Sequence, residues 1–314
     1  MQPFEHQTAA LSEIVARARA FYAAEWRELP IKPRWHSLVV APTGAGKSAL
    51  ATMARAAIGG DGGGEVTLLR ISVPGWIPGG STGRTVAETI GTIAEAVALN
   101  HRTLLVLDEL DKATTGGGLG SSGTSSSWQQ HCLLEIFDLL DGRWPTGLKL
   151  PDDADDDEIS RAELTIKLQE TVFCIGIGTF QDFFDNSGSR RTIGFGAVTD
   201  AVDEICGDDL IQKLPRELVN RMNSSIIRLP ELQADHYRLI AKQAEDTLPE
   251  RLGDAFRAEV DRRISGAIDA KKGVRYLEEC LMEVLKNLTP EPKLEIIIAP
   301  DPEPQPDPFD LCTQ

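Results

Sequence analysis

The chain has 314 residues, 41% of them hydrophobic and 25% charged, with 32 Lys and Arg residues against 48 Asp and Glu residues and a net charge of −16. This length and composition predict a globular protein with a large and a small domain, each with its own core. A surface this acidic repels phosphate backbones, which argues against nucleic acid as the main partner.

The first part of the chain alternates predicted helices with short apolar strands. The predicted elements, in order, are helix 5–29, strand 37–41, helix 48–58, strand 66–73, helix 85–99 and strand 103–107. Between them, residues 59–64 form a break and residues 74–83 a loop rich in glycine and proline. This alternation predicts an α/β fold, in which a mainly parallel sheet carries helices on both faces.

The second part of the chain is less regular before it becomes wholly helical. Its predicted segments are a flexible Gly/Ser tract at 114–127, helix 128–141, a polar insertion at 142–164, strand 171–177, an irregular stretch at 185–212 and helices from 230 to about 288. We therefore predict a large nucleotide-binding domain at 1–229, a small helical domain at 230–289 and a disordered, acidic, Pro-rich tail at 290–314 with one short strand at 294–298.

Sequence features also bear on the compartment. The five cysteines are scattered, without metal-type spacing, which suits a reducing compartment. The first residues have an early acid and no apolar core of a signal peptide, and no apolar run approaches the ~18 residues of a membrane span. We expect a cytoplasmic protein without a membrane segment.

Residues 41–48, Ala-Pro-Thr-Gly-Ala-Gly-Lys-Ser, fit the P-loop pattern with Ala41 in place of the first glycine. Small residues allow main-chain amides to surround phosphates, a lysine reaches the β and γ phosphates, and a serine hydroxyl binds Mg²⁺ at the start of a helix. The predicted ATP-binding residues are Pro42, Thr43, Gly44, Ala45, Gly46, Lys47, Ser48 and Ala49. The alternative is a Gly-rich turn with a solvated lysine, but the flanking strand and helix favour the P-loop.

Asp108 and Glu109 follow the apolar strand 103–107. An acid at this position can hold the Mg²⁺ shell, for which we predict Asp108 together with Ser48. Its neighbour Glu109 can act as the general base that polarises the attacking water. The alternative is that Asp108 only caps the next helix. No NKxD or TKxD element follows this strand, which favours ATP over GTP.

These motifs together resemble the AAA+ superfamily, and within it the ClpX/HslU-type protein unfoldases. Residues 41–48 are similar to its Walker A box, and Leu-Leu-Val-Leu-Asp-Glu-Leu-Asp-Lys at 104–112 to its Walker B box. Residues 172–180 resemble the strand that ends at sensor 1, residues 214–221 the segment of the arginine finger, and residues 273–275 the sensor-2 motif. Unlike ClpX, the sequence has one predicted helix before the P-loop and no zinc-binding domain.

The resemblance implies roles for further residues, each with a structural alternative. Arg221 would reach the nucleotide of a neighbouring subunit, or form a surface salt bridge; Arg275 would sense the nucleotide, or lie exposed on its helix. Thr179 would be the polar sensor-1 residue, although the family pattern is variable there. Trp76 and Ile77 would form a pore loop that grips substrate, or Trp76 would pack in the core.

The resemblance further implies an ATP-hydrolysing hexameric ring that unfolds or remodels protein substrates. The Ile193–Phe195 segment is similar to the loop by which ClpX docks on a peptidase, so it or the tail could bind a partner. The acidic run at 152–158 fits a solvated insertion or an adaptor loop, and the Gly/Ser tract fits a linker or a second pore loop. The alternative function is a non-threading nucleotide switch whose ATP-driven assembly recruits or regulates a partner.

Overall fold

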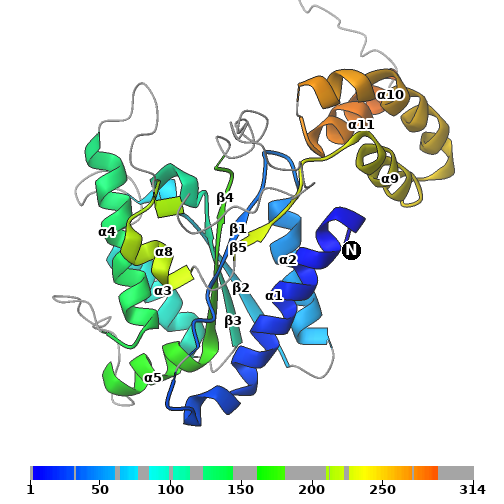
Figure 1. Cartoon of the computed structure of the whole chain (residues 1–314). Helices are drawn as coiled ribbons and strands as arrows, with labels where there is room; N and C mark the ends of the chain where they lie inside the picture. Colours follow the sequence, from blue (N-terminus) through cyan, green and yellow to red (C-terminus); the bar gives the residue numbers. More distant parts are fainter. Residues whose placement is uncertain are drawn as a thin grey trace, which may run out of the picture.

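The computed structural model describes residues 3–31, 33–60, 64–76, 85–98, 102–113, 123–143, 161–180, 210–211, 213–222, 226–270 and 272–288. A five-stranded sheet forms its centre (Figure 1). Its strands are β1 (Ser37–Val40), β2 (Val66–Ser72), β3 (Arg102–Asp108), β4 (Val172–Gly178) and β5 (Ile226–Arg228). They lie in the order β2-β3-β4-β1-β5, and every neighbouring pair is parallel. The predicted α/β fold class is thereby confirmed.

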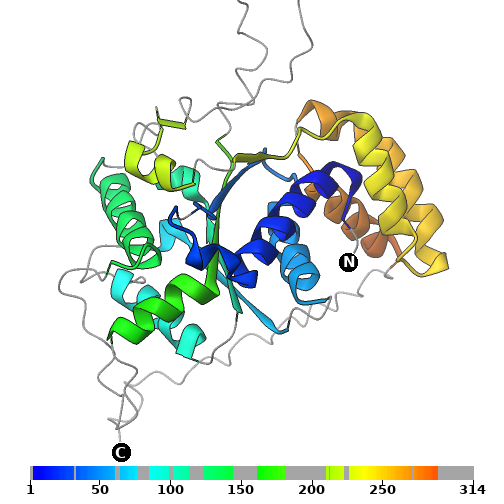
Figure 2. The ribbon, with the colours of Figure 1, turned by 60° about the horizontal axis from the view of Figure 1, so that its bottom comes forward.

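Helices cover both faces of this sheet (Figures 1 and 2). One face carries α1 (Glu5–Ala23) and α2 (Lys47–Gly60). The other carries α3 (Val86–Ala98), α4 (Gly123–Leu140), α5 (Arg161–Thr171) and α8 (Arg216–Met222). Both faces are covered because the connections between parallel strands must cross over the sheet, and they do so as helices.

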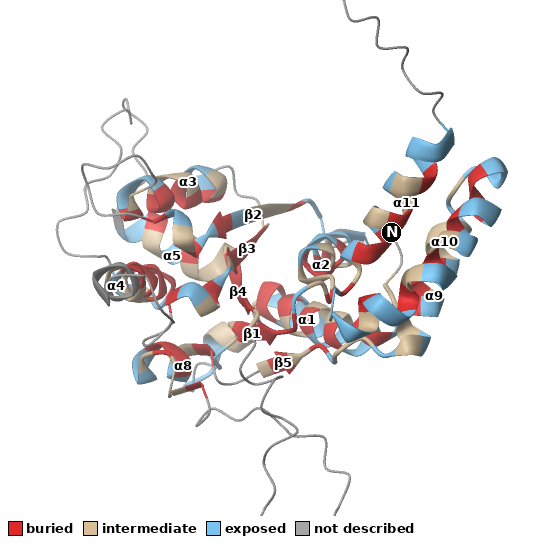
Figure 3. Cartoon of the chain, turned by 90° about the horizontal axis from the view of Figure 1, so that it is seen from above, coloured by how far each residue is buried: buried red, intermediate tan, exposed pale blue. Residues whose placement is uncertain are grey.

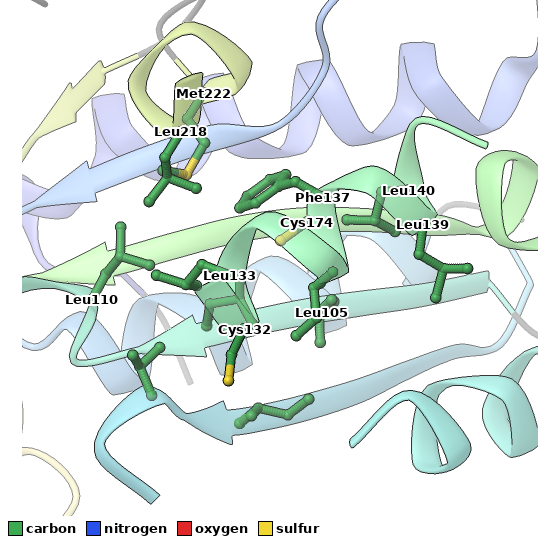
Figure 4. Close-up of a cluster of buried hydrophobic side chains, with 14 of the residues drawn as sticks. Leu105, Leu110, Cys132, Leu133, Phe137, Leu139, Leu140, Cys174, Leu218 and Met222 are labelled. Atoms are coloured by element: carbon green, nitrogen blue, oxygen red, sulfur yellow. The ribbon is translucent and has the colours of Figure 1, made fainter. Parts of the chain in front are cut away.

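Side chains of the central strands alternate between two cores. In β3, Leu105 belongs to the core under α4, whereas Leu104 and Val106 belong to the core under α1 and α2. Figure 4 shows the first of these cores, where Leu105 and Cys174 of adjacent strands meet the apolar face of α4. This period of two, with both sides apolar, explains why the strands appear in the sequence as continuous apolar runs.

The C-terminal part of the described chain is helical. It contains α9 (Ala234–Glu245), α10 (Glu250–Asp269) and α11 (Arg275–Leu288), which pack around a core of their own that includes Tyr237 and Tyr276. Buried and exposed residues alternate along these helices in Figure 3, as expected for amphipathic helices. The helical C-terminal part is confirmed, while the exact domain boundaries stay a prediction.

Several elements differ from the sequence predictions. The first helix ends at Ala23 because Ala24 takes a left-handed conformation (φ 67°), and the 3-10 turn η1 (Glu25–Glu28) follows. The helix α4 begins at Gly123, inside the tract predicted to be flexible. The sequence analysis assigned no secondary structure to α5, α8 or β5. Among the α5 side chains that the structure describes, only Leu164 and Leu168 are deeply buried, and β5 has three residues, so neither gives a clear periodic signal.

None of the helices in the described ranges is both long and apolar enough to cross a membrane.

Trp76 lies in the hydrophobic core of its own chain. Its side chain is 1% exposed, and its indole Nε1 donates a hydrogen bond of 2.9 Å to Thr89 Oγ1 on α3. The indole belongs to the same core as Val73 and Ile90. This corrects the pore-loop prediction for Trp76: α3 offers both an apolar face for the ring and an acceptor for its N–H group. Ile77 lies outside the described residues.

The position of Trp76 predicts a large effect on stability. Trp76→Ala should lower the free energy of unfolding by about 3–5 kcal/mol, because it removes a buried ring and leaves a cavity. Urea denaturation followed by circular dichroism measures this change. Met282→Ala is the control, since Met282 is 66% exposed and its replacement should change stability by less than about 0.5 kcal/mol. Equal stability of Trp76→Ala and wild type would contradict the core position.

Candidate functional site

The strand order brings three chain segments together at one edge of the sheet. β4 lies between β1 and β3, and the register pairs Val40 with Gly178 and Leu107 with Gly176. β1 leads into the loop after Val40, β4 leads into Thr179, and β3 ends with the acidic pair, of which Asp108 is its last residue and Glu109 the next. In parallel sheets, ligands bind at this carboxyl edge.

The loop between β1 and α2 has the backbone that a phosphate-binding loop requires. Gly44 and Gly46 have φ angles of 78° and 80°, a left-handed conformation that is unfavourable for residues with a side chain. The carbonyl oxygens of Ala45 and Gly46 accept hydrogen bonds from Gln7 Nε2 of α1, at 3.3 and 3.2 Å. α1 therefore holds the carbonyl side of the loop, while the first amides of α2 form an anion-binding helix terminus.

Lys47 directs its ammonium group toward oxygen atoms of the loop and of Thr179, the residue directly after β4. Its Nζ donates to the carbonyl oxygens of Ala41 and Pro42, at 2.8 and 2.9 Å, and to Thr179 Oγ1, at 3.2 Å. Burial lowers the pKa of Lys47 to about 8, although the nearby Asp111 carboxylate acts in the opposite direction. The structure thus places Thr179 beside the predicted phosphate-binding lysine.

Asp111 is a site residue that the sequence analysis did not identify. It lies in the 3-10 turn η3 (Leu110–Ala113), and its Oδ1 accepts a hydrogen bond of 3.0 Å from the Thr179 amide. Its side chain is 12% exposed and also pairs with Lys112 at 3.1 Å. Asp111 therefore fixes the backbone from which Thr179 reaches Lys47. The sequence shows an acid at position 111, three residues after Asp108, but it does not show that this acid contacts the Thr179 amide.

The acidic pair is held in a defined geometry. Asp108 Oδ1 accepts a hydrogen bond of 2.9 Å from the Glu109 amide. Glu109 has a φ angle of 58°, a left-handed conformation that is rare for residues with a side chain. Its Oε2 accepts a hydrogen bond of 3.2 Å from the Ser72 hydroxyl at the end of β2. Such strain at a site residue is consistent with a functional orientation of the Glu109 carboxylate.

Arg70 is a second residue that the sequence analysis missed. Its Nε lies 3.6 Å from Asp108 Oδ2, and its guanidinium donates a hydrogen bond of 3.1 Å to the Ser48 carbonyl oxygen. A cationic group therefore lies between the two residues predicted to hold Mg²⁺. No local pattern identifies Arg70, because the pairing of β2 with β3 that brings it beside Asp108 depends on the strand order.

The helical C-terminal part touches the loop directly. The Val274 amide donates a hydrogen bond of 2.8 Å to the Gly44 carbonyl oxygen. A Cβ atom on Gly273 would lie 2.4 Å from Gly44 Cα, so the two backbones are in contact. Arg275 begins α11, and its charge lowers the pKa of Lys47 further, after the larger effect of burial. A cavity of about 150 Å³ adjoins this junction, lined by Pro42, Thr43, Glu231, Leu232, Gln233, Tyr237, Ile268 and Gly273.

Arg221 lies away from the loop of its own chain. It is the last basic residue of α8, and its guanidinium pairs with Asp138 at 2.5 Å and with Asp141 at 3.5 Å. It also donates a hydrogen bond of 3.1 Å to the Leu134 carbonyl oxygen. Within one chain this is the salt-bridge alternative. The predicted role of Arg221 in a neighbouring subunit stays a prediction.

Other predicted features fall outside the described residues. These are the Ile193–Phe195 segment, the acidic run at 152–158 and the tail at 290–314. Within the described ranges, no group of three or more His, Cys, Asp or Glu side chains is placed to hold a metal ion. Any Mg²⁺ would therefore need phosphate oxygens in addition to Ser48 and Asp108, which is how this ion binds with nucleotides.

The groups gathered at this site are those that bind a nucleoside triphosphate and its metal ion. The loop presents glycines with positive φ and a helix terminus, Lys47 supplies a cation, and Asp108 and Glu109 supply carboxylates across β4. A partly buried lysine whose charge is only partly compensated gains strongly from an anionic ligand. This arrangement can bind phosphates and orient a water molecule toward them.

Comparison with known proteins agrees with this reading. Residues 37–192 match the family described as "ATPase family associated with various cellular activities (AAA)". The match covers the loop, the acidic pair and Thr179, and it ends before Arg221 and Arg275. No curated protein matches the chain.

The lowered pKa of Lys47 predicts a pH dependence of nucleotide binding. Above pH 8 the free protein must take up a proton at Lys47 before this residue can pair with phosphate. The affinity for Mg-ATP should therefore fall by up to about tenfold per pH unit from pH 8 toward the ordinary lysine pKa. Calorimetric titrations at pH 9, in two buffers of different ionisation enthalpy, measure the proton uptake.

Lys47→Arg is the matched control, because a guanidinium keeps its proton throughout this range. Its binding should release or take up no proton at pH 9. In the nucleotide-free wild type, the same shift means that unfolding takes up a proton between pH 8 and 10.5, so this group makes stability rise with pH across that window. Equal proton uptake by both proteins would contradict the assignment to Lys47.

Proposed function

Because the chain carries an AAA ATPase domain, we propose that it binds ATP with Mg²⁺ on the P-loop and hydrolyses it. Lys47 would bind the β and γ phosphates, and Ser48 and Asp108 would hold the metal. When bound, Mg²⁺ supplies positive charge that offsets the charge of the phosphates. The contacts of Lys47 with loop oxygens support this assignment, because phosphate oxygens can replace them at little cost in desolvation.

Glu109 would orient and deprotonate the attacking water. The backbone of Glu109 has a strained, left-handed conformation, and one of its carboxylate oxygens accepts a hydrogen bond from the Ser72 hydroxyl. Thr179, tied to Asp111, would hydrogen-bond the terminal phosphate from the neighbouring strand. Both residues would thus approach the phosphate from fixed positions, which is the main way in which such sites lower the barrier.

One observation carries the proposal that hydrolysis drives movement: the contact between the P-loop and the helical C-terminal part. Gly44 and Gly273 touch through their backbones, and the Val274 amide binds the Gly44 carbonyl oxygen. A phosphate bound by the loop would act on this junction without any intermediate element. Arg275, which follows directly, would sense the phosphate and move α11 with it.

The finer proposal is a ring-forming motor of the ClpX type that unfolds or remodels proteins. AAA proteins commonly assemble into rings, with six subunits as the expected number. Arg221 lies far from the P-loop of its own chain, which is compatible with a role at the nucleotide site of a neighbouring subunit. To act there it would have to exchange Asp138 and Asp141 for phosphate, so its function would depend on assembly.

The burial of Trp76 favours a second candidate function. The residue proposed to grip a threaded polypeptide is committed to the core, and its N–H group is bonded to Thr89. A nucleotide-controlled switch, in which ATP-driven assembly recruits or regulates a partner, needs no gripping loop. Both candidates share the same ATP site and differ in whether turnover is required.

Glu109→Gln tests the shared ATP site. The amide cannot accept a proton from water, so hydrolysis should fall by at least about 100-fold. ATP affinity should stay within about threefold of wild type, because Glu109 is not proposed to bind the phosphates. Phosphate release and titration with a fluorescent ATP analogue measure the two quantities. Hydrolysis at the wild-type rate would contradict the proposed base.

The same variant separates the two candidate functions. Particle images of Glu109→Gln with ATP should show a closed ring if the chain is a ring-forming motor. Density held in its channel supports threading, whereas a ring that binds a partner without turnover supports the switch. A monomer under saturating ATP would contradict both.

Gly273→Ala tests the coupling between the loop and the helical part. A Cβ atom there would overlap Gly44, and φ is +65°, so we expect about tenfold weaker binding of Mg-ATP from a strain of about 1–2 kcal/mol. Gly266→Ala is the matched control, because no heavy atom lies within 4 Å of its added Cβ. It should leave affinity unchanged. Unchanged affinity in Gly273→Ala would contradict the coupling.

A further inference from the structure

A second cavity lies at the opposite edge of the sheet from the P-loop. Its volume is about 480 Å³, within the range of sites for small molecules. It is bordered by His36, directly before β1, and by the ends of α4 and α5. At about 3.3 Å per strand residue, β1 separates His36 from the P-loop by about 16 Å. A ligand in this cavity would not occupy the nucleotide site.

One wall of the cavity is aromatic. The rings of Phe21 and Trp26 are stacked, with centroids 5.7 Å apart and planes at 22°. Trp35 closes the group, with its ring centroid 5.9 Å from that of Trp26. Phe21 is buried beneath Trp26, whereas Trp26 and Trp35 are partly exposed and give a surface on which a planar aromatic group can stack.

The opposite part of the lining carries charged side chains, among which cations outnumber anions. Arg27, Arg34 and Arg221 face two carboxylates, Asp141 and Glu170. This local sign is opposite to the net charge of −16 of the whole chain. His36 adds no charge at neutral pH, because desolvation lowers its pKa to about 4.

The guanidinium groups are placed to be shared with an anion. Arg27 lies 3.5 Å from the Glu170 carboxylate and donates to the Glu170 carbonyl oxygen at 3.0 Å, and Arg34 donates to the Asn220 carbonyl oxygen. Arg221 pairs with Asp138 at 2.5 Å and with Asp141 at 3.5 Å. A bound anion would share these guanidinium groups with their protein partners. Burial raises the pKa of Asp141 despite the nearby Arg221. Arg27 and Arg221 are partly buried, so an anion gains more from their guanidinium groups than it would in water.

We propose that this cavity binds a small aromatic anion, with its ring against Trp26 and Trp35 and its acidic group held by Arg27 and Arg34. None of the lining residues is proposed to hold ATP within the same chain. Because Arg221 lines it, a bound ligand would also touch the segment proposed to serve a neighbouring subunit.

The probe for this site is 1-anilinonaphthalene-8-sulfonate, an aromatic anion whose fluorescence rises on binding. We expect saturable binding of one probe per chain. Arg34→Gln, a change at an exposed side chain, should weaken it about tenfold through the loss of one charge-assisted contact. Trp26→Leu should weaken it to a similar extent through lost stacking. Arg55→Gln is the matched control, because Arg55 is an exposed arginine of α2 that bonds the Val66 carbonyl oxygen and does not line the cavity.

Two comparisons test the chemistry and the place. The uncharged N-phenyl-1-naphthylamine should bind at least about tenfold more weakly, and equal affinity would overturn the anion part of the proposal. Lys47→Ala should bind the probe like wild type, and displacement of the probe by Mg-ATP would place it in the nucleotide site and overturn the proposal. Loss of binding in Met282→Glu, on the exposed apolar face of α11, with none in Arg34→Gln or Trp26→Leu would overturn it as well.

Discussion

An ammonium group that is largely withdrawn from water must be surrounded by oxygen atoms, and Lys47 is such a group. Its Nζ contacts two carbonyl oxygens of its own loop and the hydroxyl of Thr179. The loop can supply these oxygens only because its glycines adopt left-handed backbone angles, and Thr179 can reach only because β4 lies between β1 and β3. The arrangement of the site therefore depends on satisfying this one charge.

The strand order explains why so much of the site is built from main-chain geometry. Three parallel strands end side by side, and each delivers one functional segment: the P-loop, Thr179 and the acidic pair. α1 adds Gln7 from one side, and the helical C-terminal part adds Val274 from another. Few side chains are needed to build the site, because the strand ends and the start of α2 already converge on it.

The sequence predicted the parts of this site that are encoded locally. Strand runs with apolar side chains on both faces, the P-loop pattern and the two acids after a strand are all contained in short segments. The sequence could not predict relations that depend on the strand order, such as Arg70 beside Asp108 or Asp111 beneath Thr179.

Trp76 shows the limit in another way. A tryptophan between glycines and prolines suggests exposure, since its own loop has little to bury. The partner that buries it, Thr89 with the apolar face of α3, comes from the next helix. The contacts of Arg221 were equally hidden in the sequence, because its partner Asp138 lies on α4 and its partner Asp141 directly after that helix. The sequence around a residue does not indicate its contacts when the partners come from another helix or strand.

The contact between Gly44 and Gly273 joins two positions that are far apart in the chain. Both need a hydrogen atom where any other amino acid has a carbon, and both fill the same small space. Each also has a left-handed φ angle of its own, 78° for Gly44 and 65° for Gly273, so a side chain at either position is unfavourable whatever residue stands at the other. Together the two glycines set the smallest separation that the P-loop and the helical C-terminal part can reach.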